Sequence, residues 1–226
     1  MSSPVTLLPK VPIMQHQPLF ICFEGIDGAG KTTQLDRLYT YLVDCGIDVI
    51  KTREPGGTPL AEHIREGMLS TDLTESVSPM TELLMVYAAR QQHLDNVIRP
   101  ALTNGTWVLC DRFIDTTYAY QIRGRCLSPA LFHQLNDIVV RDTKPDLTLF
   151  FTLPDEVYQA RLAGRTEKSD RLDRESHLFA ERVIGGLKER ARFCGHPTVM
   201  ADGAIEEVTE RMLDTLRRYI NLPEAA

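Results

Sequence analysis

The sequence predicts one α/β domain in which a five-stranded parallel sheet is flanked by helices, giving three layers. From residue 19 onward, short apolar stretches alternate with longer amphipathic ones. The short stretches are apolar almost throughout, rather than at every second residue, which is typical of strands buried on both faces. Alternating strands and helices require right-handed crossover connections, and these produce a parallel sheet with helices on both faces.

The elements are expected in a regular order along the chain. Strands are predicted at 19–23, 48–51, 107–110, 147–153 and 198–200. Helices are predicted at 32–45, 59–69, 79–103, 129–140, 155–163, 174–193 and 205–220. The helix at 79–103 has the clearest start, because Ser78 precedes Pro79 and Glu82 follows in the first turn. No internal repeat is present, so residues 19–226 are expected to form a single domain after a disordered tail at 1–18.

Composition excludes several classes of function. With 25 basic and 31 acidic residues the net charge is −6, which leaves no broad basic face for nucleic acid. The apolar stretches are too short to span a membrane, and the N-terminus lacks the pattern of a signal peptide. Five widely spaced cysteines without a CxxC pair predict a reducing compartment. Met14 stands just before the first strand, so a translation start there is a hypothesis that an intact mass measurement tests.

The strongest motif is a glycine-rich phosphate loop of the form GxxxxGK[ST], the P-loop, between the first predicted strand and helix. Its residues are Gly25, Ile26, Asp27, Gly28, Ala29, Gly30, Lys31, Thr32 and the following Thr33. Backbone N–H groups of such a loop and the start of the next helix bind phosphate oxygens. Lys31 is expected to bridge the β- and γ-phosphates and Thr32 to ligate Mg²⁺. A nucleoside triphosphate is therefore the expected ligand of a P-loop NTPase fold.

Three further segments are expected at the carboxyl edge of the sheet. Asp111 follows the third strand, where a second carboxylate meets the metal, and Arg112 is next to it. Arg53 lies beside a Pro-Gly-Gly turn and offers a guanidinium to phosphate. Whether the Glu54–Pro55 peptide bond is cis is left open. Residues 161–174 are basic and rich in small polar residues, which predicts a mobile lid that closes over phosphates, with a solvated salt-bridged loop as the alternative.

These segments together resemble the thymidylate kinase family, bacterial type, among P-loop nucleoside monophosphate kinases. The resemblance runs from about residue 19 to the C-terminus and includes GIDGAGKTT, TREPGGTPLAE, YAAR, IRPAL, the DR at 111–112, TYAYQ, KPDLTL and DRLDRES. It implies the reaction ATP + dTMP → ADP + dTDP, a step of dTTP synthesis, with Mg²⁺. It also implies a cytoplasmic homodimer that acts on small nucleotides, without a nucleic-acid or membrane partner.

The resemblance also implies roles for individual residues. The acceptor nucleotide dTMP would be held by Asp27, Arg53, Val86, Arg90, Arg112, Thr117, Tyr120 and Gln121. Within this set, Arg90 would address the thymine base and Tyr120 would crowd the ribose 2′ position. Catalysis would rest on Lys31, Asp27 and Arg112 together with one further arginine, which in families of this design comes from either the phosphate loop or the lid. Because Gly28 occupies the loop position here, the lid would supply it, with Arg165 as first choice and Arg161 as second. Thr32 and Asp111 would hold the metal.

The chain departs from the family pattern at three places. Val86 replaces a phenylalanine that usually stacks on thymine. Ile122 and Arg123 replace part of a glycine-rich run after Gln121 and are expected to stiffen that loop. Thr152 replaces a common aspartate, with a minor effect expected.

Two alternative functions remain open: a kinase for another nucleoside monophosphate or deoxynucleoside, and a regulatory GTPase. The TKPD segment at 143–146 matches a guanine-binding pattern, but it precedes its strand instead of following it.

Overall fold

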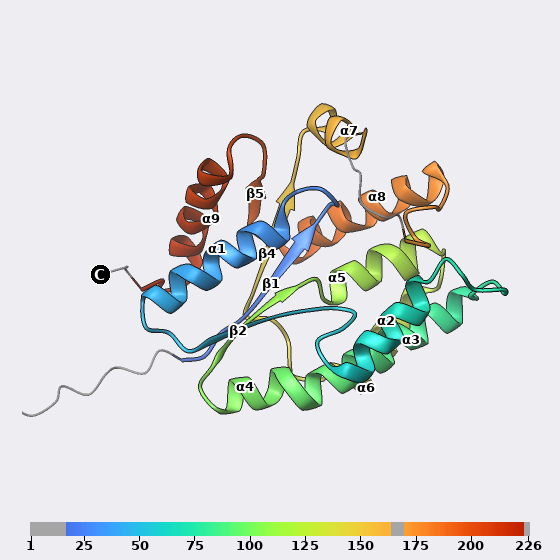
Figure 1. Cartoon of the computed structure of the whole chain (residues 1–226), viewed down its shortest axis with the longest axis horizontal. Coiled ribbons are helices and arrows are strands. Elements are labelled where there is room, and N and C mark those ends of the chain that lie inside the picture. Colours follow the sequence, from blue (N-terminus) through green and yellow to red (C-terminus); the bar gives the residue numbers. More distant parts are fainter. Residues whose placement is uncertain (1–16, 164–169, 224–226) are drawn as a thin grey trace, which may run out of the picture.

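The computed structural model describes residues 17–163 and 170–223 of the 226-residue chain. Its centre is a five-stranded parallel sheet with strand order β2-β3-β1-β4-β5 (Figure 1). The strands are β1 (Phe20–Gly25), β2 (Val49–Arg53), β3 (Trp107–Asp111), β4 (Leu147–Thr152) and β5 (Thr198–Met200). Helices flank the sheet, so the predicted α/β fold class with a five-stranded parallel sheet is confirmed.

The helical elements form the outer layers around this sheet. They are α1 (Lys31–Asp44), α2 (Pro59–Leu69), α3 (Pro79–His93), η1 (Leu94–Ile98), α4 (Arg99–Thr103), α5 (Ile114–Thr117), η2 (Tyr118–Gly124), α6 (Pro129–Val139), α7 (Asp155–Ala163), α8 (His177–Cys194) and α9 (Ile205–Tyr219). Helices α1 and α9 lie side by side next to the sheet (Figure 1). Within the described residues, no helix has both the length and the apolar character that crossing a bilayer requires.

The central strand β1 contributes alternate side chains to two hydrophobic clusters. Ile21 and Phe23 pack in the larger cluster with α1, α8 and α9, whereas Phe20 and Cys22 pack in the second with α3, η1 and α6. All four side chains are fully buried. Both faces of β1 are therefore buried over residues 20–23, which explains why the sequence shows a continuous apolar stretch here.

Each predicted strand is present, with different bounds at four of the five. Strands β1, β2 and β3 extend to Gly25, Arg53 and Asp111, because parallel pairing continues past the apolar residues; Arg53 is in register with Asp111. The fourth strand ends at Thr152 instead of 153. The carboxyl ends of β1, β2 and β3 thus bring the polar candidates to one edge of the sheet.

The helix predicted at 79–103 is a continuous helical run, but its hydrogen bonding changes from α-helical to π-helical and back within it. Ser78 caps α3 as predicted, accepting the Thr81 N–H at 3.1 Å. The π-helical segment η1 then separates α3 from α4, and Pro100 follows at the start of α4. Proline has no N–H to donate and clashes with the carbonyl four residues before it, so a wider turn is favoured immediately before it.

The segment at 114–124 is helical, including the run after Gln121 that was interpreted from the sequence as a loop. It forms α5 and the π-helical η2, which packs closely against α8. Gly186 of α8 permits the approach, since a Cβ there would lie 3.0 Å from the Cα of Ala119. Residues such as Thr117 and Tyr118 have weak helix propensity, and tertiary packing decides the conformation.

The helix predicted at 174–193 begins at His177, because Ser176 caps it and accepts the Phe179 N–H at 3.3 Å. Smaller shifts of one residue occur at the ends of α1, α6 and α9. Of the predicted lid at 161–174, residues 164–169 lie outside the described part of the chain.

Candidate active site

The phosphate loop leaves the carboxyl end of β1 and leads directly into α1. Gly25 has φ +133°, and a Cβ at this position would lie 2.0 Å from the Phe151 carbonyl oxygen on the neighbouring strand. Only glycine fits such a close backbone approach. The loop therefore starts at the sheet edge with its backbone turned back toward the N-terminus of α1, as anion binding requires.

Lys31 is the buried cation of this loop. Its Nζ donates to the carbonyl oxygens of Gly25 and Ile26 at 3.0 and 2.9 Å. Burial and the neighbouring Arg112 cation lower the pKa of Lys31 to about 8. The ammonium is thus held within the loop, beside the position that phosphate oxygens would take.

Thr32 and Asp111 place two candidate oxygen ligands for a cation beside the loop. The Thr32 hydroxyl donates to Oδ2 of Asp111 at 2.6 Å. The other carboxylate oxygen, Oδ1, is buried and has no hydrogen-bond partner among the described residues. Hydroxyl and carboxylate oxygens are the ligands that Mg²⁺ prefers, and a free buried oxygen fits a cation.

Arg112 and Asp27 form an ion pair across the edge of the sheet. Tyr120 donates its hydroxyl to Oδ2 of Asp27 at 2.6 Å. Burial opposes the charge on Arg112, but the Asp27 carboxylate nevertheless raises the pKa of the guanidinium. Arg112 also adopts a left-handed backbone conformation with φ 69°, a strained state for a residue other than glycine that is often found at functional sites.

Buried Glu24 holds the turn that carries Arg112. Its carboxylate accepts the N–H groups of Phe113 and Thr116 at 2.7 and 3.1 Å and the Thr116 hydroxyl at 2.7 Å. Burial and the neighbouring Asp115 carboxylate raise the pKa of Glu24. Because Glu24 belongs to β1, this contact connects the phosphate loop strand to the segment that follows β3.

Arg90 of α3 is fully buried and reaches the same region from the opposite side. Its Nε donates to Glu54 at 2.7 Å and its Nη2 donates to the Thr117 hydroxyl at 2.9 Å. The third nitrogen, Nη1, is buried and has no partner among the described residues. A buried donor of this kind is available to an acceptor atom of a ligand.

A second layer of buried side chains fixes Glu54 and hence Arg90. Glu54, in the cis peptide bond Glu54–Pro55, lies 3.0 Å from Nδ1 of His93, and Nε2 of His93 lies 2.7 Å from the Thr52 hydroxyl. The side chains of Glu54 and His93 are fully buried, and Thr52 is partly buried. The network gives Arg90 a single orientation.

Two cavities meet at this edge of the sheet. One, of about 470 Å³, is lined by side chains that include Val86, Arg90, Thr117, Tyr120 and Gln121, and we call it the acceptor cavity. The other, of about 910 Å³, is lined by the phosphate loop with Arg53 and Asp111, and we call it the phosphate-loop cavity. Both linings include the same four side chains: Asp27, Glu54, Arg65 and Arg112.

The two remaining candidate arginines with described side chains lie next to the loop. Arg53 lines the phosphate-loop cavity and pairs with Glu62 at 2.8 Å, so it is not placed in the acceptor cavity. Arg161 donates to the carbonyl oxygens of Gly28 and Ala201 at 2.8 and 3.0 Å. Arg165, the first-ranked lid arginine, lies outside the described residues.

Sequence reasoning missed several polar side chains of the site: Glu24, Glu54, Arg65, Glu82 and His93. Glu54 lies inside the TREPGGTPLAE motif, but only its neighbour Arg53 was predicted to bind a ligand. Glu82 was interpreted only as a helix-start residue, and His93 was given no role. Nothing local in the sequence marks these residues, because most of their hydrogen-bond partners are 36 or more residues away.

The fold, the phosphate loop and two cavities that share charged side chains define a P-loop nucleotide-binding enzyme of the kinase type. A family model described as thymidylate kinase matches residues 23–212. A thymidylate kinase of Pseudomonas putida is 49% identical over 199 residues, covering 88% of this chain and 94% of the relative. The chain belongs to the thymidylate kinase family.

Two further comparisons agree with this assignment. A thymidylate kinase of Ectopseudomonas mendocina is 52% identical over 173 residues, covering 76% of this chain and 81% of the relative. The crystal structure of thymidylate kinase from Ehrlichia chaffeensis matches with a TM-score of 0.71 at 32% identity, covering 89% of this chain and 100% of that one.

Proposed function

We propose that the protein transfers the γ-phosphoryl group of ATP to dTMP, forming dTDP and ADP, a step of dTTP synthesis. The observation that carries this proposal is the junction of the two cavities at Asp27 and Arg112. Direct transfer between two nucleotides requires their phosphates to meet in a water-poor space between fixed charges. Membership of the thymidylate kinase family supports the identity of the two substrates.

In this proposal the donor ATP occupies the phosphate-loop cavity. Loop N–H groups and Lys31 hold the β- and γ-phosphates, and the free oxygen of Asp111 with the Thr32 hydroxyl would hold Mg²⁺. The bound metal would neutralise charge on the phosphates. Arg112, kept charged and oriented by Asp27, would lie between donor and acceptor and attract the acceptor phosphate.

The acceptor dTMP occupies the other cavity. The unpaired Nη1 of Arg90 would donate to an acceptor atom on the thymine edge, and Thr117 would present its hydroxyl oxygen beside it. Tyr120, held by Asp27, would border the sugar and disfavour a ribose 2′-hydroxyl. A base matched to these fixed donors is favoured over one that leaves them unpaired.

A coupled assay of ATP consumption across dTMP, dUMP, dCMP, dGMP and AMP tests this proposal. We expect dTMP to have the highest kcat/KM. A higher value for another monophosphate would instead make the protein a kinase for that nucleotide. The GTPase alternative is not favoured: Asp146 of the TKPD segment accepts the N–H of Phe20 at 2.7 Å, at the edge of the sheet opposite the phosphate loop.

We also propose a homodimer in the cytoplasm. Large apolar side chains are exposed on three neighbouring helices, namely Leu60 on α2, Leu84 on α3 and Ile138 on α6, each more than half exposed. A second copy covering them would remove this apolar area from water. The five cysteines are free, which agrees with a reducing compartment. Light scattering that gives twice the chain mass would support the dimer, and the mass of one chain would contradict it.

Val86→Phe is expected to tighten dTMP binding. Val86 lines the acceptor cavity one turn before Arg90, so a ring there would cover the face of the base. The gain should stay below the ~1–3 kcal/mol of a full base–aromatic stack, because valine already excludes water. Steady-state KM for dTMP and the thermal midpoint, measured on one preparation, check this.

The matched control is Leu83→Phe on the same helix, a fully buried side chain. Overpacking of a core typically costs ~1–3 kcal/mol of unfolding free energy, so this variant should have a lower thermal midpoint. Its KM for dTMP should not change. If Val86→Phe behaves like this control, then Val86 serves the core and does not face the base.

Nucleotide binding is expected to depend on pH through Lys31. Its pKa of about 8 in the free protein should rise when phosphates approach, so binding above pH 8 takes up a proton. Affinity for ADP should be highest below pH 8 and fall by about tenfold per unit above it. Burial and Asp27 raise the pKa of Tyr120 well above its ordinary value, so the phenol stays neutral over this range.

Titration calorimetry at pH 7 to 9.5, in buffers of different ionisation enthalpy, measures both the affinity and the proton uptake. The Lys31→Met variant should bind ADP more weakly and take up no proton. An affinity that is constant across this range in the parent protein would show that the ammonium does not contact the phosphates.

A further inference from the structure

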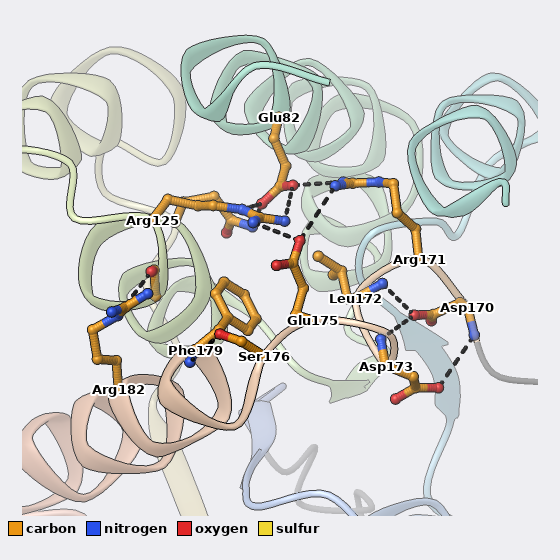
Figure 2. Close-up of polar contacts among 12 residues, drawn as sticks. Glu82, Arg125, Asp170, Arg171, Leu172, Asp173, Glu175, Ser176, Phe179 and Arg182 are labelled. Atoms are coloured by element: carbon orange, nitrogen blue, oxygen red, sulfur yellow. Dashed lines mark hydrogen bonds and ion pairs between the residues drawn. The ribbon is translucent and has the colours of Figure 1, made fainter. Parts of the chain in front are cut away.

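Glu82, on the first turn of α3, is a fully buried carboxylate with four polar contacts from three other side chains. It accepts Gln121 Nε2 at 2.9 Å, Arg125 Nε and Nη2 at 3.2 and 2.9 Å, and Arg171 Nη2 at 2.5 Å. Figure 2 shows Arg125 and Arg171 approaching this carboxylate from opposite sides. The three partners lie 39, 43 and 89 residues away in sequence, so this arrangement joins separate parts of the fold.

Arg171 belongs to residues 170–175, which we call the roof segment. Its backbone N–H donates to the Leu69 carbonyl at 3.1 Å, and its Nε donates to the Met68 carbonyl at 2.9 Å. The segment is also ordered internally, since Oδ1 of Asp170 accepts the N–H groups of Leu172 and Asp173 at 2.8 and 3.0 Å. These contacts attach the roof segment to the end of α2 and to α3.

The roof segment borders the acceptor cavity. Asp170, Leu172, Asp173 and Glu175 are among the residues that line it, while the Arg171 guanidinium is directed to Glu82 (Figure 2). Gln121 lines the same cavity from η2. Glu82 thus connects two walls of the cavity, although it is not among the residues that line it.

The charges in this cluster are balanced. Glu82 and Glu175 face Arg125 and Arg171, and Glu175 pairs with Arg125 at 2.6 Å. Burial alone would raise the pKa of Glu82, but the hydrogen bonds from Arg125, Arg171 and Gln121 hold it below its ordinary value. The carboxylate is therefore ionised at neutral pH, and removing its charge would leave two guanidinium groups with one partner fewer.

We propose that Glu82 is a positioning residue for the acceptor nucleotide: through Arg171 it fixes the roof segment over the acceptor cavity, and through Gln121 it fixes the opposite wall. Its contribution falls on binding of the monophosphate and not on phosphoryl transfer, because it touches neither cavity directly. This inference rests on the proposed function for the identity of the acceptor, dTMP.

The first test is kinetic and uses Arg171→Gln, which removes the guanidinium contacts of the roof segment with Glu82 and with the Met68 carbonyl, while Arg125 and Gln121 still satisfy Glu82. We expect KM for dTMP to rise roughly tenfold, with kcat and KM for ATP within about twofold of the parent, as loss of uniform substrate binding requires. Glu82→Gln should behave in the same way. Arg182→Gln is the control, because Arg182 donates to the Gly124 carbonyl at 3.1 Å next to the cluster without contacting the roof segment (Figure 2).

The second test needs no substrate. Hydrogen exchange followed by mass spectrometry should show the amides at 171–173 exchanging at least about tenfold faster in Arg171→Gln than in the parent, with α3 unchanged. Arg171→Lys, which keeps the cation, should restore most of this protection. If Glu82→Gln does not fold, Arg171→Gln alone carries both tests.

Unchanged exchange at 171–173 in Arg171→Gln overturns the inference whatever the substrate proves to be. A fall in kcat at constant KM overturns it as well, since the role would then be in transfer. Faster exchange in a protein that phosphorylates a different monophosphate would keep Glu82 as the positioning residue and would reject dTMP as the acceptor.

Discussion

Lys31→Met is expected to lower kcat for phosphoryl transfer by roughly 10²–10³-fold while leaving the fold intact, the range found when one preorganised group that stabilises transition-state charge is removed. Lys31 is the cation inside the phosphate loop, and its Nζ is held by two loop carbonyls beside the expected phosphates. Methionine has a similar length and no charge, so it fills the space without attracting the transferring group.

Circular dichroism and steady-state kinetics check this expectation on the same preparation. Lys144→Met provides a matched control, because Lys144 is exposed and precedes β4, at the opposite edge of the sheet. The control should retain the parent kcat. Equal kcat in Lys31→Met and the parent would remove the phosphate loop from the mechanism.

Arg165→Ala is expected to lower kcat by about 10³–10⁵-fold with a much smaller change in KM for dTMP, the range found for arginines that stabilise the transferred phosphoryl group. The phosphate loop carries Gly28 and no arginine, so, as the family resemblance implies, the charge is expected from the predicted lid at 161–174. Single-turnover measurements with ATP and dTMP separate the transfer step from binding.

Arg161→Ala is the informative comparison, because its guanidinium already donates to the carbonyl oxygens of Gly28 and Ala201. We expect a smaller loss of kcat here, since Arg161 holds the loop and the segment after β5 together. A reversed order, with Arg161→Ala more impaired than Arg165→Ala, would assign the catalytic charge to Arg161. Near-parent activity in both variants would favour the solvated-loop interpretation of 161–174.

Local sequence was sufficient wherever the structural signal lies in neighbouring residues. The helix start at Ser78 and Pro79 is a capping interaction across three residues, and the structure shows it. The order of the TKPD segment relative to its strand argues against a guanine site, and Asp146 does lie at the edge of the sheet opposite the phosphate loop. The π-helical conformation of segments 94–98 and 118–124 was not predicted from the sequence, because it depends on packing and on the position of Pro100.

The sequence by itself determined the class of this protein: continuous apolar stretches define the buried strands, and the glycines, Lys31 and Thr32 of one loop define the phosphate site through backbone geometry. Tertiary structure alone decided how the acceptor side is built. Arg90 takes its orientation from Glu54 and Thr117, and Glu82 takes its partners from residues 121, 125 and 171. The physical reason is that a buried charge requires partners wherever packing brings them, and no local pattern records which distant side chain will arrive.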